Sequence, residues 1–199
     1  SILIPGGSPR IEGCTIAGNS EEGGFDMGRV VCYRDSSPTL TNCTIVGTSA
    51  EYYGAVVCFD ASPVLTNCTI TRGSCGMHME SECSPTLTNC IVWDNRGGSF
   101  GGGSTGGNLG IAYSCIDEDP LFCGWVDRHE VWVDPSSAAP GDGSEGNPYA
   151  DPSQAAGGSF SLALSAGSPC RGTGQGGCDM GADNGRCDGP PVGSRIVHL

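Results

Sequence analysis

The chain contains no lysine, so all nine of its basic residues are arginine, and 22 acidic residues bring the net charge to −13. Nucleic acids and anionic membranes attract clustered basic side chains, and the sequence has no such cluster. It also has no apolar run long enough to span a bilayer. We therefore expect neither a nucleic-acid partner nor insertion into a membrane. The charge is typical of an extracellular protein or of one that lives in salt.

Aromatic residues are scarce, at 7%, and the common metal motifs are missing. There is no Cys-x-x-Cys pair, which argues against a zinc ribbon. Met77-His78-Met79 offers soft ligands that suit copper. On a strand, however, the two methionines share one face and the histidine takes the other. We therefore expect no copper site and no required cofactor.

Four copies of one motif dominate the first 90 residues. The copies begin with Ser-Pro at Ser8, Ser37, Ser62 and Ser84, which are 29, 25 and 22 residues apart. A motif that returns at this period is typical of a solenoid, in which each repeat is one coil that contacts only its neighbours.

Aligned copies give columns of equivalent residues. Apolar columns alternate with polar ones, which is the period of a strand. The inward columns of the motif are Ile11, Leu40, Leu65 and Leu87, then Ile16, Ile45, Ile70 and Val92. A second apolar stretch precedes each later motif, and its inward residues are Val30, Cys32, Val56, Cys58, Met77 and Met79.

A glycine or asparagine interrupts the alternation in every copy. The column consists of Gly13, Asn42, Asn67 and Asn89. Both residue types tolerate left-handed backbone angles, so the column predicts a tight corner between two short strands. Stacked asparagine side chains can also hydrogen-bond from coil to coil.

Together these patterns predict an all-β protein, a parallel β-helix of about four coils. We expect the coils over residues 1–95 and a Gly-rich bridge without fixed secondary structure over residues 96–111. Residues 112–199 are expected to form a loop-rich, disulfide-stapled C-terminal region, because large residues are few there and small cores need staples.

The run Ser-Ser-Pro-Thr-Leu-Thr-Asn-Cys-Thr-Ile over 36–45 resembles the right-handed parallel β-helix repeats of large secreted bacterial proteins, common in planctomycete-like genomes. The same fold carries pectate lyases, polygalacturonases and adhesin passengers. Residues 113–122 and 164–182 resemble C-terminal closing segments of such proteins, and residues 131–150 resemble a segment that usually opens the helix. The resemblance implies an extracellular or cell-surface protein.

Cysteine is abundant, with 13 residues. Cys14, Cys43, Cys68 and Cys90 form one motif column and are expected to be buried thiols stacked inside the solenoid. The disulfide candidates lie in the connecting segments: Cys75 with Cys83, Cys115 with Cys123, and two among Cys170, Cys178 and Cys187. The sequence alone does not fix this connectivity.

The candidate site lies on the outward face of the stretch that precedes each motif, together with Val31 and Val57. Its glycan-binding candidates are Tyr33, Phe59, His78 and Trp93, since a sugar site needs a flat ring and hydrogen-bond acceptors. The carboxylates Asp35, Asp60, Glu80 and Glu82 are the catalytic candidates if the protein is an enzyme, because paired carboxylates can act as acid and base on a glycosidic bond. The alternative is that these aromatic and acidic side chains lie on a solvent-exposed face that binds no ligand.

Two further patterns are weaker. Asp117, Glu118 and Asp119 could bind Ca²⁺, or could form a solvated acidic loop. Thr15, Thr44 and Thr69 form a column similar to those of ice-binding solenoids, but it is one residue wide and ends at Ile91, so we discount it.

The function we expect is that of a secreted or cell-surface module with a structural, adhesive or glycan-binding role. The alternative is a polysaccharide lyase or glycoside hydrolase that acts on an acidic polysaccharide. A β-helix exposes unpaired backbone groups at its ends, and the chain begins with an apolar stretch, Ile2–Ile4. We therefore also expect end-to-end contacts with other copies or with surface proteins.

Overall fold

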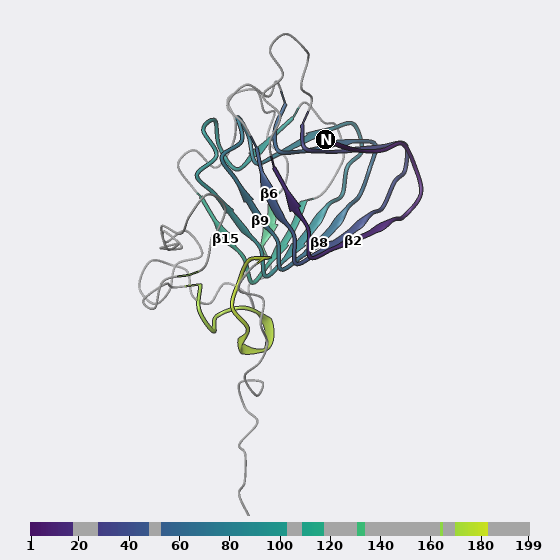
Figure 1. Cartoon of the computed structure of the whole chain (residues 1–199). Coiled ribbons are helices and arrows are strands. Elements are labelled where there is room, and N and C mark those ends of the chain that lie inside the picture. The colour runs from purple at the N-terminus through teal and green to yellow at the C-terminus, as the bar shows by residue number, and fades with distance from the viewer. Residues whose placement is uncertain are drawn as a thin grey trace, which may run out of the picture.

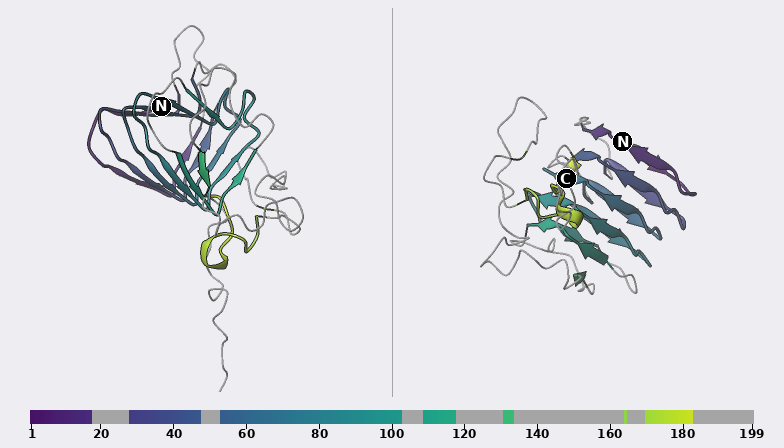
Figure 2. Two further views of the ribbon diagram at one scale, coloured as in Figure 1. Left: turned by 180° about the vertical axis from the view of Figure 1, so that it is seen from behind. Right: turned by 90° about the horizontal axis from the view of Figure 1, so that it is seen from below.

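Three parallel β-sheets surround one apolar core in the computed structural model (Figure 1). The structure describes residues 1–17, 28–47, 53–102, 109–117, 131–133, 164 and 170–182. Each coil contributes one strand to each sheet, and successive coils lie side by side from the purple first coil to the green last one (Figure 2, right). The chain is therefore a parallel β-helix, as predicted.

The strands are short and follow the repeat. Sheet A contains β1 (Ile2–Ile4), β4 (Val30–Tyr33), β7 (Val56–Phe59), β10 (Met77–Glu80) and β13 (Phe100–Gly101). Sheet B contains β2 (Arg10–Glu12), β5 (Thr39–Thr41), β8 (Val64–Thr66), β11 (Thr86–Thr88), β14 (Leu109–Ala112) and β16 (Val131–Val133). Sheet C contains β3 (Thr15–Ile16), β6 (Thr44–Val46), β9 (Thr69–Thr71), β12 (Ile91–Trp93) and β15 (Cys115–Ile116). The one helix among the described residues is a 3-10 turn at Gln175–Gly177.

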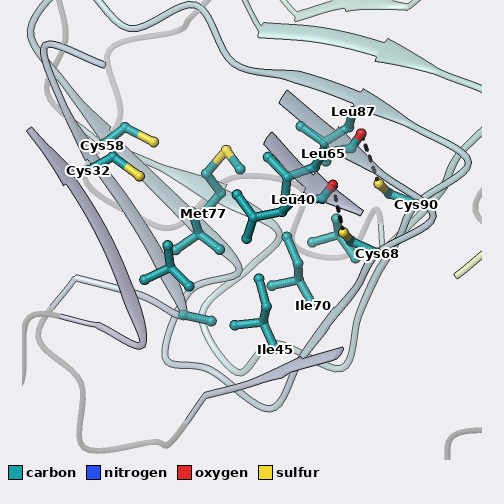
Figure 3. Close-up of a cluster of buried hydrophobic side chains, with 14 of the residues drawn as sticks. Cys32, Leu40, Ile45, Cys58, Leu65, Cys68, Ile70, Met77, Leu87 and Cys90 are labelled. Atoms are coloured by element: carbon teal, nitrogen blue, oxygen red, sulfur yellow. Dashed lines mark hydrogen bonds between the residues drawn. The ribbon is translucent and has the colours of Figure 1, made fainter. Parts of the chain in front are cut away.

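The predicted columns are the observed registers. Leu65 pairs with Leu40 on one side and with Leu87 on the other, and all three are buried in the core. Cys32 pairs with Cys58 in sheet A, and both point inward (Figure 3). The core therefore consists of apolar columns that stack from coil to coil, as the alternation in the motif indicates.

The Gly/Asn column makes the predicted corners between sheets B and C. Asn42, Asn67 and Asn89 have φ angles of 53°, 51° and 55°, and Gly13 has 62°. The side-chain amide of Asn67 donates to Oδ1 of Asn42 at 3.1 Å, so two rungs of an asparagine ladder are formed.

The thiols that follow the corners also link neighbouring coils. Cys68 Sγ donates to the carbonyl of Thr66 at 3.4 Å and to that of Leu40 in the preceding coil at 3.5 Å. Cys90 Sγ likewise donates to the carbonyls of Thr88 and Leu65. Figure 3 draws the bonds from Cys68 to Leu40 and from Cys90 to Leu65. The column is buried as predicted except at Cys14, which is exposed in the first coil.

The solenoid extends beyond the four predicted coils. Strands β13, β14 and β15 add a fifth, and Tyr113 takes the corner position with a φ of 49°. Ser114 stands in the cysteine column, where its hydroxyl donates to the Ala112 carbonyl at 2.8 Å and accepts from the Cys90 amide at 3.0 Å. The expectation that residues 96–111 lack fixed secondary structure is therefore wrong for β13 and for the part of β14 within them.

Residues 170–182 pack beside sheet C and its corners (the yellow-green segment of Figure 1). Met180, Cys170 and Leu164 form a small apolar cluster with Ile91 and Cys115 of sheet C. The amide of Ala182 donates to the Thr69 hydroxyl at 3.0 Å. We call residues 170–182 the C-terminal strap.

Two of the predicted disulfide pairings are wrong, and the third set of candidates loses Cys170. Cys83, Cys115 and Cys170 form no disulfide, which excludes the pairs Cys75–Cys83 and Cys115–Cys123. Cys83 instead donates to the carbonyls of Glu80 and Cys58, at 2.9 and 3.3 Å. Cys75 and Cys178 each take part in a disulfide. Cys123 and Cys187 lie outside the described residues, so a disulfide-stapled C-terminal region stays a prediction.

We expect the stacked thiols to make the protein sensitive to alkali. Hydrogen bonding to the Cys68 thiol and burial raise the pKa of Cys43 well above its ordinary value. Hydrogen bonding to Cys32 and burial do the same for the pKa of Cys58. Above about pH 9 the folded state therefore binds more protons than the unfolded state, and its stability falls by up to about 1.4 kcal/mol per pH unit per thiol.

Urea unfolding between pH 7 and pH 10 under reducing conditions measures this loss. Cys43→Ser is the matched variant, because Ser114 shows that a hydroxyl fits this column and serine does not titrate. The variant should lose stability less steeply with pH than the wild type. Identical slopes would contradict the assignment of the loss to Cys43.

Candidate functional site

An aromatic pair lies on the outward side of sheet A. Tyr33 of β4 and Phe59 of β7 are in register, and their rings stack with centroids 4.9 Å apart and planes 7° apart. Glu80 of β10 continues the column. Parallel in-register strands place equivalent side chains one strand spacing apart, about 4.8 Å, which is the distance at which aromatic rings stack. The sequence thus builds a flat aromatic surface by repeating one position.

Tyr53 borders this surface from the segment that precedes β7. Its ring meets the Phe59 ring edge to face, with centroids 5.6 Å apart and planes 85° apart. It also contacts the His78 ring, at 4.7 Å between centroids. Burial and the neighbouring Tyr53 raise the pKa of Tyr33, so the Tyr33 phenol is a protonated hydrogen-bond donor at neutral pH.

His78 and Glu80 supply polar atoms beside the rings. Both belong to β10 two residues apart, so they share its outward face. His78 Nε2 lies 2.9 Å from Glu80 Oε1, and the two side chains are 13% and 32% exposed. This contact orients the carboxylate and leaves part of it accessible as a hydrogen-bond acceptor. We call Tyr33, Tyr53, Phe59, His78 and Glu80 the aromatic site.

The remaining predicted carboxylates lie on the turns that follow these strands. Asp35 and Asp60 are exposed, have left-handed φ angles of 57° and 54°, and are joined by a 2.6 Å bond from the Asp35 amide to the Asp60 carbonyl. Glu82 is exposed on the turn of the next coil. The fold therefore sets three carboxylates on successive turns beside the aromatic site.

Other parts of the predicted site differ from the structure. Val31 and Val57 were expected on an exposed face, but they are only 3% and 0% exposed. In β4 and β7 the accessible part of the outward face is therefore at the end of the strands, at Tyr33 and Phe59. Trp93 belongs to sheet C, where it pairs with Thr71 and packs against the cluster under the C-terminal strap. It is not part of the aromatic site.

The metal candidates do not come together. Met77 and Met79 are buried in the core while His78 faces outward, as the strand period predicts. Asp117 accepts a bond from the Asp94 amide at 3.3 Å through Oδ2, and Glu118 and Asp119 lie outside the described residues. Within the described part of the chain, no three His, Cys, Asp or Glu side chains are grouped to hold a metal ion.

Residues 97–101, Gly-Gly-Ser-Phe-Gly, match the Gly-x-Ser-x-Gly pattern of hydrolase nucleophiles. The structure gives Ser99 a different role. It is fully buried, and its hydroxyl lies 2.8 Å from the Asp117 carbonyl and 3.4 Å from the Val92 carbonyl. Ser99 therefore ties the fifth coil to the fourth and is not an accessible nucleophile.

Comparisons with known proteins agree with this architecture. Residues 1–116 match the family model described as right handed beta helix region. The search of curated proteins and the search of solved structures each gave no match. No helix in the described residues is long and apolar enough to cross a membrane.

Proposed function

The chain belongs to the right-handed β-helix family, and from this premise we propose that it is a secreted or cell-surface module that binds a glycan at the aromatic site. The family suggests a structural or carbohydrate-related role, and the finer assignment rests on one observation. Tyr33 and Phe59 form a flat stacked pair with a half-exposed acceptor, Glu80, in the same column. Sugar rings bind to such surfaces through their C–H faces, while carboxylates and phenols bind their hydroxyls.

Charge narrows the class of glycan. Asp35, Asp60 and Glu82 lie on the turns beside the aromatic site, which itself contains Glu80, and Arg34 is the one basic residue on these turns. Like charges across an interface disfavour binding. The site therefore suits a neutral or amine-bearing polysaccharide better than the acidic one first considered.

We expect Phe59→Ala to weaken glycan binding by about tenfold or more, because a stacking aromatic contributes about 1–3 kcal/mol in comparable ring contacts. A glycan array followed by calorimetry with the best oligosaccharide measures the change. Trp93→Ala is the matched control, since it removes an aromatic ring of sheet C outside the site, and it should bind like the wild type. Equal loss in both variants, with unchanged circular dichroism, would show that the site lies elsewhere.

The same ligands test the enzymatic alternative. Reducing-end and unsaturated-product assays would detect hydrolysis and β-elimination, respectively. Cleavage that disappears in Asp60→Ala would favour a polysaccharide-cleaving enzyme. Binding without cleavage would favour the binding module.

End-to-end assembly is a second proposed role, and the first coil supports it. Among the residues that the structure describes, strands β1, β2 and β3 each pair with one neighbouring strand only, at one end of sheets A, B and C. Leu3 of β1 is 61% exposed there. A second copy that pairs with this edge would make a head-to-tail contact that does not close. Light scattering over a range of concentrations tests the proposal, and a monomer at all concentrations would refute it.

A further inference from the structure

The outer face of sheet B carries a two-column array of threonines, and we propose that this face binds an ordered water lattice, the surface of ice. The threonine array consists of Thr39, Val64 and Thr86 in one column and Thr41, Thr66 and Thr88 in the other. It lies on β5, β8 and β11, on a different sheet from the aromatic site.

The backbone fixes the spacing of the array. Equivalent residues on neighbouring strands are about 4.8 Å apart, and residues i and i+2 of one strand about 6.6 Å apart. In a tetrahedral network of water with hydrogen bonds of about 2.75 Å, second neighbours are about 4.5 Å apart. The ladder of Thr41, Thr66 and Thr88 thus repeats at nearly the distance at which water oxygens repeat in ice.

The hydroxyls of the array are available to water. Thr86 is exposed, Thr39, Thr41, Thr66 and Thr88 are half-buried, and none of the five is bonded through its side chain to another residue of the described structure. A hydroxyl both donates and accepts, as the molecules of an ice surface do. Each threonine also carries a methyl group, and Val64, 40% exposed, has a methyl in place of one hydroxyl.

Charge and aromatic rings are absent from the array although the chain carries a net charge of −13. The outward residues of the first coil are Arg10 and Glu12, which form an ion pair with each other at 2.9 Å. The fifth coil contributes Gly110 and Ala112. Within the array itself no charged group can bind an ion and no ring can bind a sugar; Trp132 follows Gly110 in register, two strands beyond Thr86. With ions and sugars disfavoured as ligands, the partner that fits the array is itself a neutral, repeating surface of hydrogen-bonding groups.

The core holds the array in place. Leu40, Leu65 and Leu87 alternate with the threonines on the same strands, and they are at most 1% exposed. A face that is already ordered loses little conformational entropy on binding. By contrast, Thr44 and Thr69 of sheet C are 2% and 1% exposed, so the threonine column discounted from the sequence is accessible only at Thr15 and offers no continuous surface.

Partition into slowly growing ice tests the proposal with the full chain, labelled at its N-terminal amine. We expect the wild type to enter the ice several-fold more than a globular protein of similar size that does not bind ice. Thr66→Tyr, at the centre of the array, and Thr86→Lys, at its exposed column, should both fall to that background. Val64→Thr, which completes the grid, should partition at least as well as the wild type.

The controls distinguish loss of ice binding from loss of the fold and from loss of glycan binding. Circular dichroism identifies a variant that has lost its fold, and the two array variants serve as checks on each other. Phe59→Ala should enter ice like the wild type, so glycan binding and ice binding fail independently. Background partition of the wild type, or wild-type partition of both folded array variants, would overturn the proposal. Binding to crystalline cellulose or chitin that requires Thr66, without entry into ice, would also overturn it in favour of a polysaccharide surface.

Discussion

Replacement of Leu65 by alanine is expected to lower the free energy of unfolding by about 2–5 kcal/mol, the range for cavity-forming changes of leucine in a core. Leu65 is 0% exposed and lies between Leu40 and Leu87 in the central column. Each neighbour is fixed by backbone hydrogen bonds between adjacent coils, so the column cannot collapse into the space that the side chain leaves. The whole cavity cost should therefore remain.

Urea unfolding of Leu65→Ala and Thr66→Ala provides the measurement. Thr66 is the adjacent outward residue, and its side chain is half-buried, so its loss should cost less than about 1 kcal/mol. A large difference between the two midpoints is expected. Equal midpoints would mean that the inward and outward faces of β8 are assigned the wrong way round.

Replacement of Asn67 by valine is expected to cost about 2–4 kcal/mol in free energy of unfolding. Asn67 has a φ of 51°, a conformation in which a β-branched side chain is strained by about 1–3 kcal/mol. The change also removes the 3.1 Å bond from its amide to Asn42, which is worth about 1 kcal/mol. Both losses fall on the turn that joins sheet B to sheet C.

Asn67→Gly separates the two contributions in the same unfolding experiment. Glycine adopts a left-handed conformation without strain, as Gly13 does in the first coil with a φ of 62°. It should therefore lose only the side-chain bond and cost about 1 kcal/mol. If glycine proved as damaging as valine, the ladder and not the backbone angle would determine the cost.

The repeat predicted the inward half of the molecule because stacking constrains it directly. A residue such as Leu65 must match the residues above and below it, so one motif is enough to place every copy. The fifth coil was missed because Gly110 to Ser114 retain little of the motif. The spacing from Ile111 to Ile116 equals that from Leu87 to Val92, and this was the one signal that could have revealed it.

The outward half was harder to predict because nothing in the repeat determines what covers it. The alternation of apolar and polar residues correctly predicted that Tyr33, Phe59 and Val57 face outward. It could not predict that other residues bury Val57 completely. Tyr53 could not be assigned to the site, since it comes from a connecting segment with no counterpart in the other coils. The cysteine pairings failed for a related reason, because a thiol that bonds to carbonyls, as Cys83 does, looks in the sequence like one that forms a disulfide.

The C-terminal strap has a consequence for the order in which the protein forms during synthesis. Contacts between coils join residues close in sequence, such as Asn42 and Asn67, 25 residues apart. The strap instead joins Gln175 to Asn89 and Ala182 to Thr69, across 86 and 113 residues. Local contacts form faster than distant ones, and the strap is translated after every coil that it touches. A ribosome should therefore release a nascent chain whose coils are already wound, and the outer side of sheet C stays open to solvent and to chaperones until the strap arrives.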